Sequence, residues 1–193
     1  MGLHLGGDAV TAMTLPLSLR NWLAELVLAA LHDGDARRRL ERVATSFDAT
    51  AAPHASEVQE RARRAWGVLR DRALDARHAS AAATLDSAAA LFDGGLYFEV
   101  HELLEPHWLE AEAGDREAFQ GLIQIAVGFQ HLANGNVVGA RALLRDGAFK
   151  VAGKRLHELE LDAFGRAVQA CLQKIGDEAK GFDWTSVPRF PTP

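Results

Sequence analysis

Apolar residues recur at steps of three and four along most of this 193-residue chain, which is the spacing that buries one face of an α-helix. Before residue 80 the pattern predicts three helices, with Leu26, Leu40, Phe47 and Val58 among their buried positions. Beyond it we predict helices over about residues 84–93, 97–112, 116–133, 136–150 and 155–175. No stretch alternates apolar and polar residues as a strand does. We therefore predict an all-α fold, an irregular helical bundle built of antiparallel helical hairpins.

The chain divides into two parts at an alanine-rich stretch, His78–Ala83. We expect residues 1–80 to form an N-terminal helical arm of about three helices, and residues 81–193 to form a helical core. The core ends in an extended C-terminal tail, in which Phe182 and Trp184 are apolar anchors.

Charge is distributed unevenly between these parts. Residues 1–80 hold 11 arginines and 10 acidic residues, whereas residues 81–193 hold 10 basic and 16 acidic residues, giving a net charge of −5. An acidic body repels phosphate backbones, so we expect no nucleic-acid partner. Arg61–Arg77 is the one basic stretch, and because it also carries Asp71 and Asp75 we interpret it as a solvated helix face.

The sequence also predicts a cytoplasmic protein. The longest apolar run near the N-terminus, Trp22–Leu31, is about half as long as a bilayer-spanning helix and contains Glu25. We expect no membrane span. The single cysteine, Cys171, allows no intrachain disulfide, which fits a reducing compartment.

Polar residues follow one stripe of the predicted helix over residues 97–112. At about 100° per residue, Tyr97, His101, Glu105 and Trp108 fall within about 80° of one another, with apolar residues on both sides. Three other acids of this helix point elsewhere on the wheel, and we expect them to face solvent: Glu99, Glu102 and Glu110.

The next predicted helix, over residues 116–133, is apolar almost all round, which is typical of a central buried helix. Its polar exceptions, Gln120, Gln124 and His131, share one line. A short loop makes the two helices antiparallel neighbours, which sets Glu105 beside Gln124. Together the seven residues of the two lines form what we call the polar seam.

The polar seam has three interpretations. It is a hydrogen-bonded network that fixes helix register, or a ligand or metal site, or a catalytic site. As a metal site it offers His101, Glu105 and His131, which suit zinc or iron. Tyr97, Trp108, Gln120 and Gln124 would then contact a small ligand. As a catalytic site it offers Glu105 as general base with His101 as its partner.

Three stretches, in order, resemble domain of unknown function family 309. They are residues 91–108 (LFDGGLYFEVHELLEPHW), residues 119–127 (FQGLIQIAV) and residues 135–140 (GNVVGA). The tail motif at residues 181–184 is similar to the C-terminal signature of that family, so the resemblance covers about residues 84–185. It implies a small helical bundle of bacterial, archaeal or plastid origin, and no agreed reaction. The family's signature positions here are Tyr97, Glu99, His101, Glu102, Glu105, Trp108, Gln120, Gln124, Gly135, Asn136 and Asp183.

Two functions from different classes remain open. The first is binding of a divalent metal or small ligand in the polar seam, with a hydrolase-type reaction. The pattern His-Glu-x-x-Glu at residues 101–105 lacks the second histidine of metalloproteases, so it does not indicate a protease. The alternative is a non-catalytic interaction or dimerisation module, acting as a homo-oligomer, whose polar seam is purely structural.

Overall fold

The computed structural model describes residues 15–46, 53–75 and 80–192 of the chain, so Phe47 and part of the predicted arm lie outside the described residues. The first helices are α1 (Leu17–His32), α2 (Gly34–Ser46) and α3 (Ala55–Leu69). After them come α4 (Ala81–Asp93), α5 (Tyr97–Glu110), α6 (Ala113–Ala133), α7 (Val137–Val151) and α8 (Asp162–Leu172). Within the described ranges the regular structure is almost entirely helical, which confirms the predicted all-α fold.

One predicted helix begins later than expected. The segment from residue 155 opens not as a helix but as a short antiparallel hairpin, β1 (Arg155–Leu156) and β2 (Leu159–Glu160). His157 makes the turn in the left-handed region, at φ 51°, and the leucine of each strand is buried. Strands of two residues are too short to produce a visible alternation, which is why the sequence pattern merged them with α8.

Helix α6 is packed between α5 and α7. Its contact with α7 is unusually close because glycines face each other there. A Cβ built at Gly147 would lie 2.7 Å from the carbonyl oxygen of Gly121, nearer than real side chains approach a backbone. Small residues at a crossing let two helix backbones touch, and α6 consequently buries its apolar side chains almost completely.

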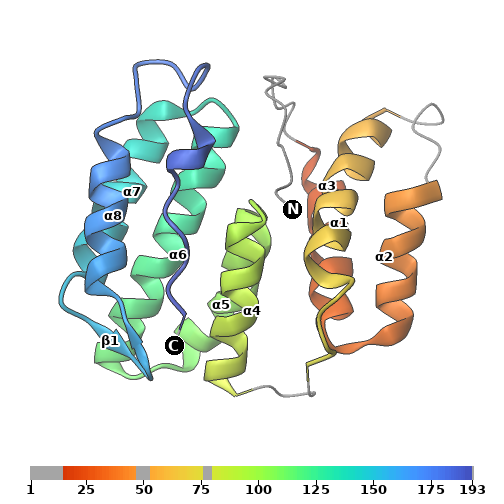
Figure 1. Ribbon diagram of the computed structural model, residues 1–193, viewed down its shortest axis with the longest axis horizontal. Coiled ribbons are helices and arrows are strands. Elements are labelled where there is room, and N and C mark those ends of the chain that lie inside the picture. Colours follow the sequence, from red (N-terminus) through yellow and green to blue (C-terminus); the bar gives the residue numbers. More distant parts are fainter. Residues whose placement is uncertain (1–14, 47–52, 76–79, 193) are drawn as a thin grey trace.

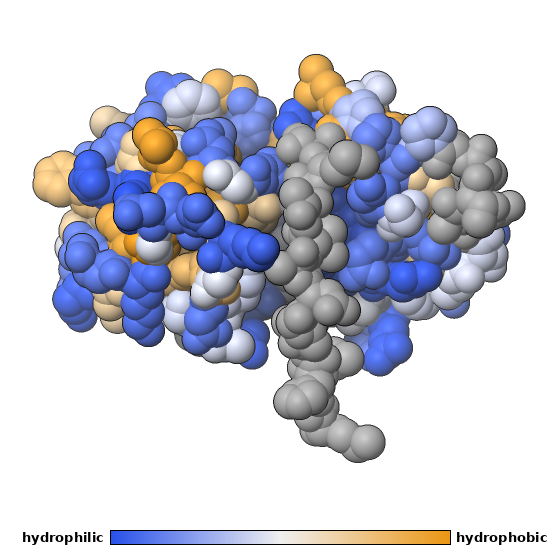
Figure 2. Space-filling view, turned by 90° about the horizontal axis from the view of Figure 1, so that it is seen from above, coloured by the Kyte–Doolittle hydropathy of each residue, from blue (hydrophilic) through white to orange (hydrophobic). Residues whose placement is uncertain are grey.

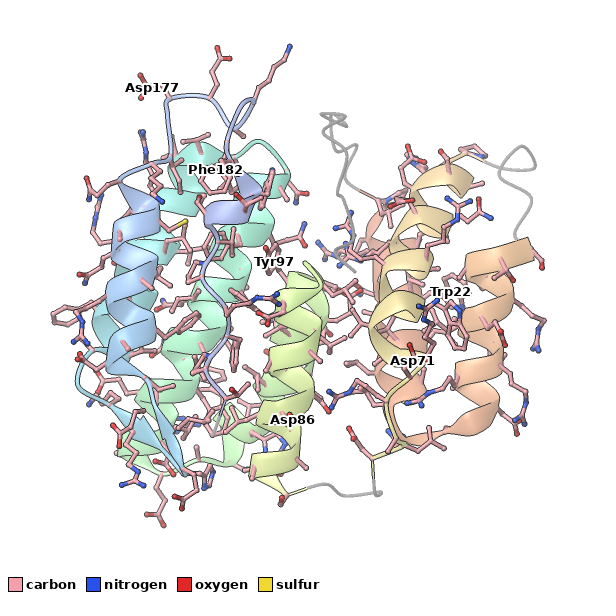
Figure 3. The ribbon with its side chains drawn as sticks, viewed as in Figure 1. Trp22, Asp71, Asp86, Tyr97, Asp177 and Phe182 are labelled. Atoms are coloured by element: carbon pink, nitrogen blue, oxygen red, sulfur yellow. The ribbon has the colours of Figure 1, made fainter. Side chains whose placement is uncertain are left out.

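The helices form two groups that lie side by side (Figure 1), with α1–α3 in one and α4–α8 in the other. They are joined by an ion pair between Arg72 Nη2 and Asp86 Oδ2 at 2.6 Å. Asp86 is labelled on α4 in Figure 3. The hydroxyl of Ser87 donates to Asp75 Oδ2 beside it, also at 2.6 Å. Seen from above, hydrophilic residues cover much of both groups, with smaller hydrophobic patches among them (Figure 2).

The C-terminal tail runs back along the core. It forms a single turn of 3-10 helix, η1 (Trp184–Ser186), and then an extended segment. The two predicted anchors, Phe182 and Trp184, pack edge to face with 5.1 Å between their ring centroids, and Phe182 is buried. The deepest aromatic anchor is a third residue, Phe190, whose ring packs against Phe92 and Phe164. None of the described helices is long and apolar enough to span a membrane.

Candidate functional site

Three chemistry-bearing side chains of α5 lie together: His101, Glu102 and Glu105. One potential ligand atom from each lies within 4.8 Å of those of the other two. His101 Nδ1 is 2.9 Å from Glu102 Oε1, a hydrogen bond whose donor depends on the histidine tautomer. The side chains are half-buried, with 27% of His101 and 35% of Glu102 exposed. We call these three residues the α5 cluster.

Glu102 belongs to this cluster, so the prediction that it faces away from His101 is wrong. The helical wheel follows the direction of Cβ, and Cβ of Glu102 does point to a different side from that of His101. A glutamate carries its carboxylate three bonds farther out, which is enough to reach back to the neighbouring imidazole. The sequence signal was present, because two adjacent long polar side chains can meet whatever their wheel angles.

Glu99 is the second correction. It was expected to face solvent, yet its side chain is 0% exposed. Arg61 of α3 reaches it, donating from Nε to Glu99 Oε1 at 2.8 Å and from Nη2 to Oε2 at 2.7 Å. This fork-to-fork geometry is the strongest form of an ion pair. Nothing in the pattern of α5 alone could show that another helix lies over this face.

Two residues of the predicted seam make their contacts elsewhere in the structure. Tyr97 is in the aromatic core, with its ring 5.1 Å from that of Phe92 and 5.6 Å from that of Phe129, and burial raises the pKa of its phenol. His131 lies at the far end of α6, where its Nδ1 is 2.8 Å from Asn136 Nδ2. It thereby supports the residue that caps α7, since the Asn136 side chain accepts from the amide of Gly139.

The antiparallel pairing of α5 and α6 is confirmed by ring contacts at both ends. Tyr97 packs on Phe129, and His107 stacks on Phe119 at 6.0 Å. Both pairs have residue numbers that sum to 226, which places Gln124 level with the α5 cluster and not with Glu105 alone. Gln120 lies about one helical turn away along the same line of α6, half-buried like Gln124.

Two buried polar atoms in the seam have no hydrogen-bond partner among the described residues. They are the acceptor Gln124 Oε1 and the donor Trp108 Nε1. Leaving such an atom unpaired costs about 1–3 kcal/mol, so native proteins seldom do so without another reason. By contrast His107, the other histidine of α5, is satisfied by Thr84 Oγ1 at 3.0 Å and has a packing role.

The chemistry of the α5 cluster is that of a cation ligand set. One imidazole nitrogen and two carboxylates are donors that zinc and iron accept. Two ligand atoms on one zinc ion lie at most about 4 Å apart, so small torsional changes of the two glutamates would close the set. All three residues come from one helix, within one turn, and their relative positions are therefore fixed by the backbone of α5.

Comparison with known proteins gives one match. Residues 85–143 match the model of a family described as Domain of unknown function (DUF309). The matched segment runs from α4 into α7 and contains the whole α5 cluster together with Gln120 and Gln124. No curated protein and no solved structure matched the chain.

The unpaired acceptor Oε1 of Gln124 should lower the stability of the metal-free protein. Gln124→Met keeps the shape of the side chain and removes the buried polar atom, so we expect the free energy of unfolding to rise by about 1 kcal/mol in metal-free urea denaturation. Gln130→Met, at a glutamine on another face of α6, is the matched control. Gln130 Nε2 donates to Asn134 Oδ1 at 3.0 Å, and its loss should lower stability. Destabilisation by Gln124→Met would show that the acceptor has a partner in solution.

Proposed function

We propose that this chain, whose residues 85–143 match the DUF309 family model, binds a divalent metal ion through His101, Glu102 and Glu105. The observation that carries the proposal is the convergence of their three ligand atoms within 4.8 Å on a half-buried helix face. The candidate ligand set differs from the expected one at a single position, because Glu102 takes the place assigned to His131.

The surroundings of the α5 cluster support a bound species. Gln124 is level with the cluster on α6, and Trp108 lies one turn beyond Glu105 on α5. Their unpaired acceptor and donor are the kind of groups that orient a ligand or a metal-bound water. The ring of Phe98, 6.1 Å from that of His101, gives the cluster an apolar edge.

The metal we propose is zinc or iron(II), which suit a mixed nitrogen and oxygen ligand set. Three protein ligands leave room in a four-coordinate shell for water or substrate, as in zinc hydrolases. A hydrolase-type reaction is the activity this proposal favours. Glu105 would then either complete the ligand set or, where the metal is held by His101 and Glu102, act as the general base.

Metal binding is tested by calorimetric titration of the purified, chelator-treated chain with zinc and, under anaerobic conditions, with iron(II). We expect one ion per chain and at least a tenfold weaker affinity in His101→Ala and in Glu102→Gln, because each removes one direct ligand. His157→Ala, at an exposed turn, is the control and should bind as the unmodified chain does. Stoichiometric binding that is equal in all four proteins would refute this ligand set.

A second candidate function, self-association, rests on the outer face of α7. Val138 and Phe149 are 82% and 76% exposed, the highest values among the large apolar residues that the structure describes. They are eleven residues apart, close to three full helical turns, so they share one side of the helix. Exposed apolar residues aligned along a helix are typical of an interface, and a second copy of this chain is the partner we propose.

The dimer is tested by light scattering of the full-length chain over a range of concentrations. Unmodified protein should pass from monomer to dimer as concentration rises, and Phe149→Ser should remain monomeric, because it removes the largest apolar group of the face. Ala163→Ser, an exposed position on α8, controls for an added surface hydroxyl. A monomer at all concentrations would exclude this role.

A further inference from the structure

A cavity of about 480 Å³ lies between the two groups of helices, away from the α5 cluster. Its walls come from the starts of α1 and α3, the turn before α5 and the end of α6. We infer that this cavity binds a small molecule through a phosphate group. Four arginines are among the lining residues: Arg20, Arg61, Arg63 and Arg64. Three of the four come from the basic stretch that the sequence suggested was only a solvated face.

Arg20 is the clearest free cation of the cavity. Its guanidinium lies over the ring of Phe98, 4.2 Å from the centroid, which fixes its plane. Its Nε is buried and has no hydrogen-bond partner in the part of the chain that the structure describes. No carboxylate pairs with it there either. A stacked guanidinium with unused donors is a preformed half of an arginine–phosphate pair.

Two other arginines of the cavity, Arg61 and Arg64, also have N–H donors without a described partner. Arg61 uses Nε and Nη2 to bind Glu99, which leaves its Nη1 free of any described partner. Arg64 lies against the turn before α5, where its Nη1 would be 3.4 Å from a Cβ at Gly95. No described acid forms an ion pair with Arg64. Arg63 is different, because it pairs with Glu60 at 3.4 Å and both side chains are more than half exposed.

The acids of the cavity do not cancel this charge. Among the described residues, the lining contains two carboxylates, Glu57 and Glu60. Glu60 is neutralised by Arg63, and Glu99 by Arg61. Hydrogen bonds from its own backbone amide and from Ser56 lower the pKa of Glu57, so it is charged at neutral pH and belongs to the first turn of α3. Arg20 and Arg64 together outweigh it, and the cavity has a net positive charge inside an acidic chain.

Backbone and amide groups add donors on two further sides. Within the described residues, the side chains at the N-cap positions of α1 and α5 make no capping hydrogen bond, and Leu15 and Gly95, next to those helix starts, line the cavity. Free amides at a helix start favour an anion. On the opposite wall Gln130 donates to Asn134 Oδ1, which orients the Asn134 amide so that its own NH₂ stays available. The volume exceeds that of inorganic phosphate, so the ligand is a phosphate ester.

The test is calorimetric titration of the full-length chain with three probes: inorganic phosphate, glycerol 3-phosphate and glycerol. We expect saturable one-to-one binding of both phosphates, tighter for the ester because it fills more of the cavity, and none of glycerol. Arg20→Gln and Arg64→Gln should each weaken binding by about tenfold or more, because each removes a charge-assisted contact. Raising the salt concentration should weaken it further.

Arg42→Gln is the matched control, since Arg42 is exposed on α2, in the same group of helices but outside the cavity. Thermal melting checks that each variant is folded, and Arg64→Gln decides the matter if Arg20→Gln is destabilised through Phe98. No saturable binding of either phosphate would overturn the inference, and so would equal affinity in Arg64→Gln and Arg42→Gln. Because the probes contain no metal, the result is independent of the proposal for the α5 cluster.

Discussion

The buried ion pair between Arg61 and Glu99 is the constraint on which the arrangement of the two groups of helices depends. Glu99 is fully buried, and a carboxylate without water or a partner costs several kcal/mol, so Arg61 of α3 must reach Glu99 of α5 for the charge to be tolerated. Arg61 keeps 18% of its side chain exposed, and the pair therefore sits at the edge of the joint between the groups. Its bidentate geometry fixes orientation as well as distance.

Both candidate sites take their shape from this contact. Phe98 is the neighbour of Glu99 on α5, and the same joint brings the Arg20 guanidinium over its ring and places Arg61 5.9 Å from it. Arg61 also lines the cavity. His101 follows Glu99 by two residues on α5, and its side chain is half-buried. The two candidate sites therefore differ in charge: arginines line the cavity, whereas the α5 cluster carries two carboxylates.

The sequence predicted the helices and the neighbours in space better than the contacts of long side chains. Periodicity predicted the all-α fold, the packing of α6 between its neighbours and its antiparallel pairing with α5. It could do so because the spacing of apolar residues shows which face of a helix is buried. It could not predict the partner of Glu99, since that depends on tertiary packing between segments about forty residues apart. It assigned Glu102 to the wrong side because a wheel ignores side-chain length, and it missed β1 and β2 because two residues carry no period.

A double-mutant cycle on Arg61→Met and Glu99→Leu, followed by urea unfolding of the full-length chain, tests the central claim most directly. Arg61→Met should lower the free energy of unfolding by about 3–5 kcal/mol, because it strands a buried carboxylate. Adding Glu99→Leu should restore at least half of that loss, which gives a large coupling energy between the two positions. Two losses that simply add would contradict the account, because they would mean that the ion pair does not hold the two groups of helices together.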